Sequence, residues 1–521
     1  MRLCKVLSVI WVFISIASSH ADENSWAINT TSEWKEACKT KENLELKDDL
    51  ATPTETSATF TSVVHKFKDK RSLKTISFSQ SPVWHNWEPV KNLGPANLED
   101  APVFLVKGPN DYWLFGKYGN MSPSSSKKRG KGQLEKPSGT SKPTRTNRFV
   151  SADATLDGFD IPLKTTADPH VYDAPGGLKK SLRGYHAWQS RDMVDWVHHG
   201  PVTEGFSKWV TTAEMVDGNA YIYYDYPNDQ DPHLYIDDDL TDGQPGQNMG
   251  MAFKDPTHGS DCAMIRDLNG NFHVIYEDWS PINAKNHSWD SPLAGHAVST
   301  TGKGDFHILA PPVDERTKPT GKKGKYAHPH WKQHPDWNTN IGEYEIHEPD
   351  QNAYGDWAAI CIGGQYYLFG DDHPAGKSKS DIRVAWFTSS DINKPFTKAG
   401  TIGKGHPDPD ICFAGGKFYL ITQMKTDYIS PGPWVETVKA RVGVDTTNDG
   451  TIDHWTDWKK VNESYDYLKG FSKQVKRIPA ELDLSDLPAG YGVSFEIKLE
   501  DSTENSSKPI IDSVKLMLGS N

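Results

Sequence analysis

The sequence predicts an all-β protein built around a five-bladed β-propeller. Five segments repeat one plan: an acidic residue, an apolar strand, a Gly-containing turn and an aromatic-rich returning strand. Most of them are followed by a third strand that ends in a Ser-Asp or similar turn. Sheets of three or four antiparallel strands, repeated around an axis, protect their edges as propeller blades do.

Each hairpin supports this fold prediction. Their turn chemistry is that of tight connections between antiparallel strands. The third strands are clearest in GYHAWQSRDMVDW, MGMAFKDP and IRVAWFTSSDINKPF. We therefore predict the propeller over residues 81–424, with a β-sandwich as the alternative, because sandwich strands also alternate. The five hairpins begin at Asp100, Glu214, Asp261, Asp356 and Asp408.

The N-terminal region predicts export. Residues 1–21 combine basic Arg2 and Lys5, a short apolar run and small residues near a cleavage point, which is typical of a secretory signal peptide. No stretch suits a membrane span of about 20 apolar residues. We expect an exported protein, in a periplasm, at a cell surface or extracellular. Residues 22–80 are predicted as an extension, partly helical, in SEWKEACKTKENLEL and SVVHKFKDKRSLK.

The C-terminal residues 425–521 are predicted as a small β module, since SFEIKLEDSTENSSKPIIDSVKLML alternates like a strand pair. Just before it, DTTNDGTIDHW presents Asp445, Asp449 and Asp453 like the front of a calcium loop. Thr456 stands where an EF-hand loop would have its glutamate. A structural calcium ion and a plain Asx-rich turn both fit.

Two insertions interrupt the predicted propeller. Residues 121–148 are rich in Ser, Pro, Lys and Arg, which fits a solvated loop or a segment that attracts a sulfated polysaccharide. A second insertion carries His328, His330 and His334, but no zinc signature fits and its prolines indicate irregular chain. We expect it to wall the central funnel rather than to bind metal.

Composition excludes some functions. The net charge of −12 argues against general nucleic-acid binding. The 18 Trp and 20 Tyr include rings that could stack on sugars, although most aromatics are core residues. Cys262, Cys361 and Cys412 lie in apolar runs, so we interpret them as packing residues rather than as disulfide partners.

The acidic residues of the repeats suggest a site. In a propeller the first strand of each blade lines the axis, so residues at its entrance meet in one funnel. We expect Asp100, Asp261 and Glu348 at matching entrances. Glycosidic bond cleavage needs one ionised and one protonated carboxyl group, and a third charge can hold those protonation states apart. The alternative is that these residues cap hairpins or bind water.

Several runs resemble successive blades of the five-bladed propeller glycosidases, a group that includes the arabinofuranosidases and xylosidases of glycoside hydrolase family 43. They are NLEDAPVFLVKGPNDYWLFGKY, MGMAFKDPTHGSDCAMIRDLNGNFHVIYEDW, the pair His347-Glu348, and GKGHPDPDICFAGGKFYLITQ. Within that group the chain is most similar to glycoside hydrolase family 117, the exo-acting α-1,3-(3,6-anhydro)-galactosidases of red-algal polysaccharide breakdown. The resemblance implies Asp100 as general base and Asp261 as the carboxylate that tunes acidity. It implies Glu348, as in family 43, or His347, as in family 117, as the acid.

The resemblance also implies a reaction and a set of contacts. We expect an inverting exo-hydrolase that needs no cofactor for catalysis and releases 3,6-anhydro-galactose from algal galactan oligosaccharides, sulfated ones included. A family 43-like arabinofuranosidase or xylosidase, and a non-catalytic polysaccharide-binding propeller, are the alternatives; a homodimer is left open. His406 matches a family-43 histidine that faces the axis and can contact a calcium ion or water. The expected substrate contacts are Trp113, His258, Trp279, Asp356 and His406.

Overall fold

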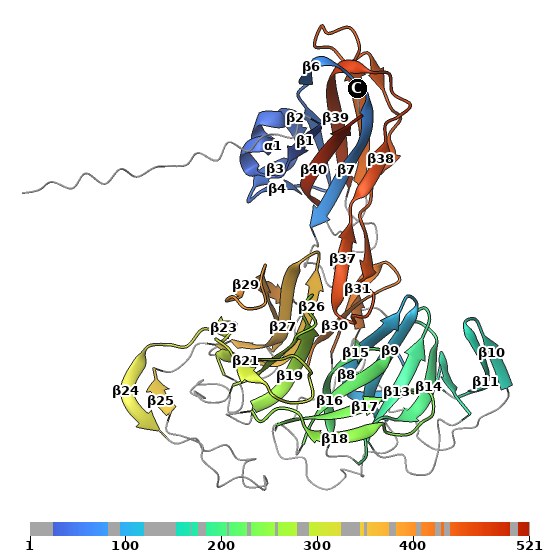
Figure 1. Ribbon diagram of the computed structural model, residues 1–521, viewed down its shortest axis with the longest axis vertical. Helices are drawn as coiled ribbons and strands as arrows, with labels where there is room; N and C mark the ends of the chain where they lie inside the picture. The colour runs from blue at the N-terminus through green and yellow to red at the C-terminus, as the bar shows by residue number, and fades with distance from the viewer. Residues whose placement is uncertain are drawn as a thin grey trace, which may run out of the picture.

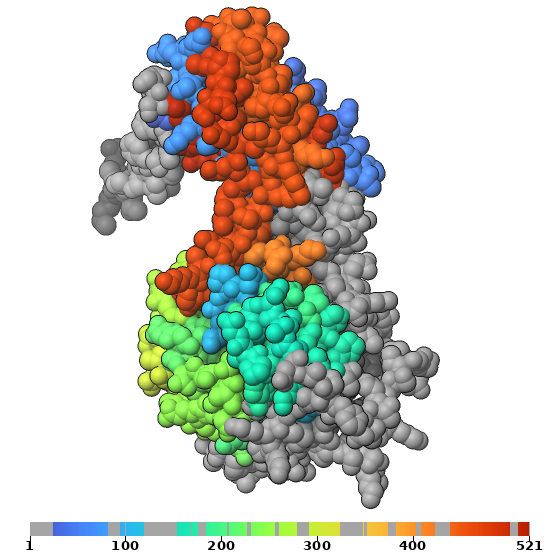
Figure 2. All heavy atoms as spheres, turned by 90° about the vertical axis from the view of Figure 1, so that its right-hand side faces the viewer, coloured from blue at the N-terminus to red at the C-terminus, as the bar shows by residue number. Residues whose placement is uncertain are grey.

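The computed structural model is all-β, with a single helix in the part of the chain that it describes. The ribbon in Figure 1 shows a ring of sheets below and a β-sandwich above. In Figure 2 the orange to red C-terminal segment spans the waist between these two bodies. The described residues are 24–81, 94–118, 153–166, 168–175, 184–205, 208–226, 231–255, 259–278, 291–324, 344–348, 352–374, 382–402, 408–422, 429–431, 438–500 and 509–519.

All five predicted hairpins are confirmed. Their tight turns place residues such as Asp217 and Gly218, or Gly363 and Gly364, in the left-handed region that two-residue hairpin turns require. The hairpins are β8 (Leu98–Gly108) with β9 (Asp111–Tyr118), β15 (Trp209–Val216) with β16 (Asn219–Asp225), β19 (Gly259–Arg266) with β20 (Phe272–Glu277), β26 (Asn352–Ile362) with β27 (Gln365–Pro374), and β30 (Asp410–Ala414) with β31 (Lys417–Ile421).

Each hairpin begins its own sheet, and further strands follow outward. The β8 sheet adds β13 (Tyr185–Ser190), β14 (Trp196–Pro201), β12 (Val171–Asp173), β11 (Phe159–Thr165) and β10 (Asp153–Leu156). The β15 sheet adds β17 (Pro232–Asp237) and β18 (Gln247–Met251), and the β19 sheet adds β21 (Leu293–Ser299), β22 (His307–Ile308) and β23 (Val313–Asp314). The β26 sheet adds β28 (Arg383–Ser389) and β29 (Thr397–Ile402), and the β30 sheet adds β32 (Ile429–Pro431).

The first strands of these sheets lie around one axis. They contact one another in the order β8, β15, β19, β26 and β30, and β30 contacts β8 again. Hydrophobic clusters fill the spaces between neighbouring sheets, including the one between the β30 and β8 sheets, where Cys412 packs with Leu114. The Phe104 N–H also donates to Asp410 Oδ2 at 2.6 Å across that junction. The arrangement is propeller-like.

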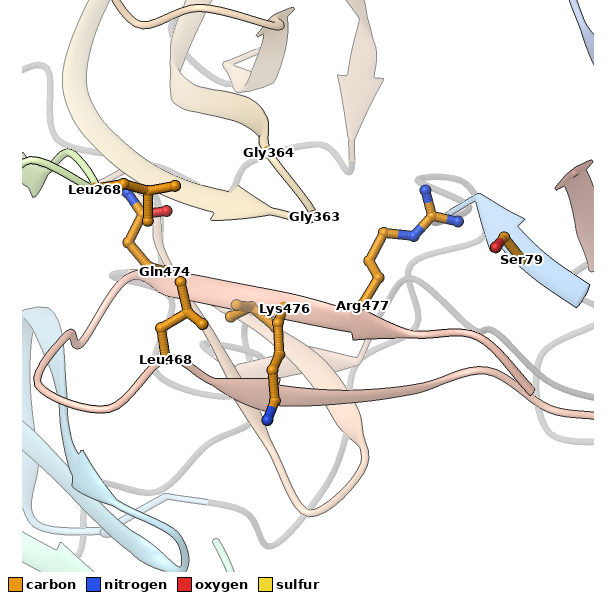
Figure 3. Close-up of a pocket in the computed structure, with 9 residues that line it drawn as sticks. Ser79, Leu268, Gly363, Gly364, Leu468, Gln474, Lys476 and Arg477 are labelled. Atoms are coloured by element: carbon orange, nitrogen blue, oxygen red, sulfur yellow. The ribbon is translucent and has the colours of Figure 1, made fainter. Parts of the chain in front are cut away.

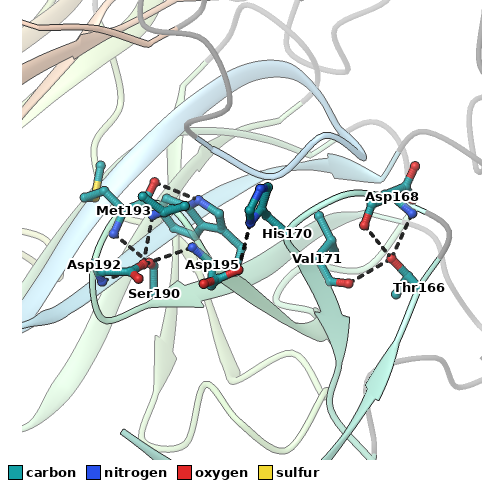
Figure 4. Close-up of polar contacts among 10 residues, drawn as sticks. Thr166, Asp168, His170, Val171, Ser190, Asp192, Met193 and Asp195 are labelled. Atoms are coloured by element: carbon teal, nitrogen blue, oxygen red, sulfur yellow. Dashed lines mark hydrogen bonds and ion pairs between the residues drawn. The ribbon is translucent and has the colours of Figure 1, made fainter. Parts of the chain in front are cut away.

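The predicted Ser-Asp turns recur at the ends of third strands. Ser190 Oγ accepts the N–H groups of Asp192 and Met193, and Asp192 Oδ1 accepts those of Val194 and Asp195 (Figure 4). Ser299 and Ser389 close turns in the same way after β21 and β28. One assignment was wrong: MGMAFKDP contributes β18, a fourth strand, and the third strand of that sheet is β17.

The two chain ends form one sandwich rather than a separate extension and module. One sheet holds β3 (Leu44–Lys47), β4 (Leu50–Pro53), β40 (Ile510–Leu518), β7 (Leu73–Ser81) and β38 (Ala480–Asp483), with β1 (Ser25–Ile28) on β40. The other holds β2 (Cys38–Glu42), β5 (Ser57–Ser62), β39 (Gly490–Glu500), β33 (Val438–Asp445) and β34 (His454–Trp455), with β35 (Lys459–Lys460) and β6 (His65–Arg71). Phe60 from the N-terminal half stacks on Phe495 from the C-terminal half, and Phe78 meets the same ring edge to face. An isolated strand pair cannot bury its apolar face, so each half needs the other.

The prediction that residues 22–80 are partly helical was confirmed at the start of the first named segment and was wrong for the second. Only α1 (Thr31–Ala37) forms, started by a capping box in which Thr30 and Glu33 exchange hydrogen bonds. SVVHKFKDKRSLK forms β6 and the start of β7 instead. Partners on β39 and β40 decide this, because β strands depend on pairing more than on local propensity.

Two further hairpins leave these bodies. β36 (Ser464–Tyr467) and β37 (Gln474–Ile478) extend from the sandwich, and β37 pairs in parallel with β26 at the axis. β24 (Pro319–Gly324) and β25 (Tyr344–His347) form a two-stranded sheet of their own, to the side of the ring in Figure 1. Cys262, Cys361 and Cys412 are buried and form no disulfide, as predicted.

Some expectations fall outside the described residues, namely the signal peptide, the basic insertion at 121–148 and the three histidines His328, His330 and His334. Among the residues that are described, no helix is long and apolar enough to cross a membrane.

Candidate active site

Aspartates begin the inner strands of three neighbouring sheets in an unusual conformation. Asp261, Asp356 and Asp408 have φ values of 28°, 50° and 54°, the left-handed region that non-glycine residues seldom adopt. The register of β19 against β20 shifts beside Asp261, and that of β26 against β27 shifts beside Asp356. Bulges of this kind re-aim a side chain, and strained backbone of this kind tends to cluster at functional sites.

A second carboxylate holds each of these aspartates in place. The acidic residue at or near the end of one sheet's second strand accepts the backbone N–H of the aspartate that begins the next sheet. Asp225 Oδ2 accepts from Asp261 at 3.2 Å, and Glu277 Oε1 accepts from Asp356 at 2.9 Å. Asp371 Oδ1 accepts from Asp408 at 2.9 Å. These hydrogen bonds therefore link neighbouring sheets at the end where the acidic side chains lie.

The sequence analysis did not assign these three supporting carboxylates. Asp225, Glu277 and Asp371 are all buried. A signal was present in the repeats, because the returning strands YIYYD, HVIYE and YLFGD each end in an acidic residue. Buried carboxylates are rare unless paired, so their recurrence indicates a role.

The side chains converge on Asp356. Carboxylate oxygens of Asp261, Glu277 and Asp356 all lie within 4.8 Å of one another, and so do those of Asp356, Asp371 and Asp408. Asp261, Asp356 and Asp408 stay partly exposed, so a ligand can reach them. Either group of three could hold a cation through oxygen ligands. Without a cation, the crowding must be relieved by a proton.

Asp356 is the group that holds that proton. Burial raises its pKa well above the usual value for an aspartate, and the nearby carboxylates of Asp408, Asp261 and Asp371 raise it further. Like charges this close cannot all ionise, so the protonated form of Asp356 is favoured. The site therefore offers a protonated acid beside further carboxyl groups.

Asp100 shares the position of these aspartates along the backbone. It lies on β8 where the register against β9 shifts between Glu99 and Val103, as β19 does beside Asp261. Its side chain is outside what the structure describes. His258, Trp279 and His406, expected as substrate contacts, also fall outside the described residues.

The structure does not bring the predicted acid pair into this cluster. His347 ends β25, where its Nδ1 contacts the Thr317 carbonyl oxygen, and Glu348 is exposed beside it. The entrance of the fourth sheet, expected for Glu348, is taken by Asp356. Sequence order alone could not separate these two acidic residues, which are eight positions apart.

Trp113 is also placed differently from the prediction. It is buried on β9, and its Nε1 donates to Asp111 at 2.9 Å near the hairpin turn. A side chain that is 1% exposed packs in the core and cannot present a face to a sugar.

The loop with Asp445, Asp449 and Asp453 forms Asx turns. Asp445 accepts the N–H groups of Asn448 at 2.7 Å and Gly450 at 2.8 Å, and Asp453 accepts from the N–H and hydroxyl of Thr446. These bonds to Thr446 lower the pKa of Asp453. Among the described residues, the groups of three close carboxylates do not include this loop. The Asx turn is therefore present, and the calcium ion at this loop stays a prediction.

No family model matches the chain, and no curated protein sequence matches it. A thermostable family-43 glycoside hydrolase of known structure is 12% identical over 68% of this chain and 92% of that one, with a TM-score of 0.33. The endo-arabinase from Bacteroides thetaiotaomicron is 10% identical over 67% and 98%, with a TM-score of 0.36. RS223-β-xylosidase is 14% identical over 70% and 98%, with a TM-score of 0.34. TM-scores this low carry no argument about this chain, whose function has to rest on its own residues.

Proposed function

We propose that this protein is a glycoside hydrolase, a five-bladed β-propeller whose acidic funnel cleaves a glycosidic bond by an inverting acid/base mechanism. One observation carries the proposal: Asp356, a partly exposed carboxyl group with a raised pKa, lies within 4.8 Å of the carboxylate oxygens of neighbouring acidic residues at the end of the ring. Glycoside hydrolysis needs such a pair of protonated and ionised groups facing one substrate.

In this mechanism Asp356 donates its proton to the leaving oxygen as the glycosidic bond breaks. Asp100, at the matching position of β8, accepts a proton from the attacking water. Asp261 orients the sugar and, through its charge, keeps the proton on Asp356. An inverting enzyme places water between base and sugar, so its two carboxyl groups stand about 6.5–9.5 Å apart.

A second candidate for the acid is the pair His347 and Glu348, which the resemblance to families 43 and 117 favours. The backbone of this pair lies at the end of β25, in a two-stranded sheet separate from the ring. The histidine would be suited to this role because its pKa normally lies near neutrality. Asp356 remains the preferred acid because it already lies in the cluster.

The finer identity of the substrate rests on the resemblance. We propose an exo-acting enzyme that releases 3,6-anhydro-galactose from algal galactan oligosaccharides, with an arabinofuranosidase or xylosidase activity as the alternative. The basic residues 121–148 would favour a sulfated chain. Export by residues 1–21 would bring the enzyme to such polysaccharides.

Product analysis on defined oligosaccharides from agarose, carrageenan, arabinan and xylan tests the proposal. The wild type should release one terminal sugar with inverted configuration. Asp356→Asn should abolish release and Glu348→Gln should leave it within about twofold of wild type; the reverse ranking would transfer the acid role to the His347–Glu348 pair. Binding without product from any chain would instead indicate a non-catalytic polysaccharide-binding propeller.

A further inference from the structure

The β36–β37 hairpin closes the axis of the ring from the face opposite the acidic cluster. Figure 3 shows the hairpin running past Gly363 and Gly364, with Gln474 beside Leu268 and Arg477 directed toward Ser79. Leu268 and the two glycines belong to hairpin turns, which lie at the other end of the inner strands from Asp261 and Asp356. Ser472, Lys473 and Gln474 are each at most 5% exposed, so this part of the hairpin is inside the ring.

Residues near the tip bind all five sheets. Ser472 Oγ donates to the Val106 carbonyl of β8 at 3.1 Å and accepts the Met215 N–H of β15 at 2.9 Å. The Gln474 side chain donates to the Arg266 carbonyl on β19. The Phe413 N–H of β30 donates to Tyr467 Oη at 2.7 Å, and β37 itself pairs with β26.

Lys473 makes the contacts that reach the strands of the candidate site. Its Nζ donates to Thr212 Oγ1 of β15 at 2.7 Å, and the same Oγ1 accepts the Met264 N–H of β19 at 3.1 Å. Met264 lies three residues from Asp261 on that strand. The Lys473 carbonyl accepts the Cys361 N–H at 2.8 Å, on the strand that carries Asp356 five residues earlier.

The charges around Lys473 explain why an ammonium group is stable in the interior. Glu214 on β15 and Asp410 on β30 are buried, and the Lys473 charge opposes the rise that burial causes in their pKa values. Arg266 acts on Glu214 in the same direction. Cys262, next to Asp261, also feels the Lys473 charge, which opposes the rise of its pKa on burial. A buried ion needs such partners, so the position of the lysine is strongly determined.

We propose that Lys473 is a positioning residue for the active site: its side chain ties β15 to β19 and its carbonyl holds β26, which fixes the spacing of Asp261 and Asp356. The inference rests on the proposed function, in which those two carboxyl groups act on one sugar. The sandwich formed by the chain ends thereby contributes to a site that it does not touch. Reaction rates respond steeply to such spacing, because a misplacement of about 1 Å can lower a rate about 100-fold.

Two matched pairs of variants test the proposal in the full chain. Lys473→Met removes the ammonium group, and Lys476→Met changes an exposed lysine on the same strand. Thr212→Val removes the bridging hydroxyl, and Thr212→Ser keeps it; this pair serves even if Lys473→Met does not fold. We expect kcat to fall about 10- to 100-fold in Lys473→Met and Thr212→Val with KM within about threefold, and to stay near wild type in the two controls.

Hydrogen exchange separates this inference from the proposed function. Peptide 259–266 should lose protection in Lys473→Met and Thr212→Val, while peptide 490–500 of the sandwich should not. Variants that lose thermal stability but keep kcat and the protection of peptide 259–266 would overturn the positioning role. If the wild type cleaves no sugar, the proposed function fails, and hydrogen exchange alone decides whether Lys473 fixes the two strands.

Discussion

Acidic residues at both ends of the inner strands have raised pKa values, but their charged neighbours act in different directions. At the entrance end Asp356 lies among Asp261, Asp371 and Asp408, and its pKa rises. At the far end the Lys473 ammonium opposes the effect of burial on Glu214 and Asp410. Charged neighbours therefore reduce the rise in pKa at the far end, whereas acidic neighbours add to it at the entrance end. Perturbed carboxyl groups in an accessible cluster are the usual mark of a functional site.

The largest effect should come from Asp356 at the entrance end. Asp356→Asn removes the transferable proton, and general acid catalysis contributes about 10²- to 10⁴-fold, so kcat should fall by that factor. Thermal stability should be unchanged or raised, because the amide relieves repulsion among the carboxylates. Steady-state rates and melting curves measure both effects, with Asp449→Asn on the exposed turn as the control. An active Asp356→Asn enzyme would contradict the assignment of the acid.

On the β36–β37 hairpin at the far end, substitutions of buried charges should lower the stability of the fold. Arg477 donates to Glu463 at 3.0 Å and to Asp512 at 2.7 Å, and the Glu463 side chain is fully buried. Removing one partner of a buried pair costs about 3–5 kcal/mol, so Arg477→Met should lower the free energy of unfolding by that amount. Lys439→Met breaks the half-exposed pair with Glu500 and should cost about 0–1 kcal/mol. Equal losses in urea titrations would show that burial does not distinguish the two pairs.

Glu214, at the far end, should make the stability of the fold depend on pH. Burial raises its pKa to about 7, above the value near 4.5 expected when unfolded, although Lys473 and the Ser472 N–H oppose the rise. A raised pKa contributes stability that is present below pH 4.5 and is lost as pH rises through 7. Glu214→Gln should therefore flatten this slope and stabilise the protein by up to about 3 kcal/mol above pH 7. A steeper slope in the variant would mean that the ionised form is the favoured one.

A substitution at Asp408 tests how strongly the neighbouring carboxyl groups raise the pKa of Asp356. Activity should be lost at high pH as Asp356 gives up its proton. Asp408→Asn removes the neighbouring charge that raises this pKa most, so the alkaline limb should move toward lower pH. The pH profile of kcat/KM measures the shift. An unmoved limb would assign the high-pH ionisation to a group outside the cluster.

The smallest effect is expected at the Asp445 turn. Because its carboxylates accept N–H groups, treatment with EDTA should leave the melting temperature unchanged. A rise in melting temperature on adding calcium, lost in Asp445→Asn, would restore the calcium assignment. Calcium would then balance the carboxylate charge of this turn.

Local pattern predicted the hairpins and third-strand turns, because each is decided within about a dozen residues by alternation and turn chemistry. It gave the wrong role to Trp113: the ring was predicted to contact the substrate, but it packs in the core. The sandwich was missed because β7 pairs with β40 more than 400 residues away. No local pattern encodes such a pairing.

The sequence by itself determined the repeated strands and the acidic residues at their beginnings, because strand periodicity and turn residues act locally. Only the tertiary structure decided which carboxylates meet, since β19 and β26 are brought together by packing across separate sheets. It also decided which charges act on each acidic group. Charges interact through space, so Lys473, far along the chain, opposes the rise in the pKa of Glu214 and Asp410, while Asp408, Asp261 and Asp371 raise the pKa of Asp356.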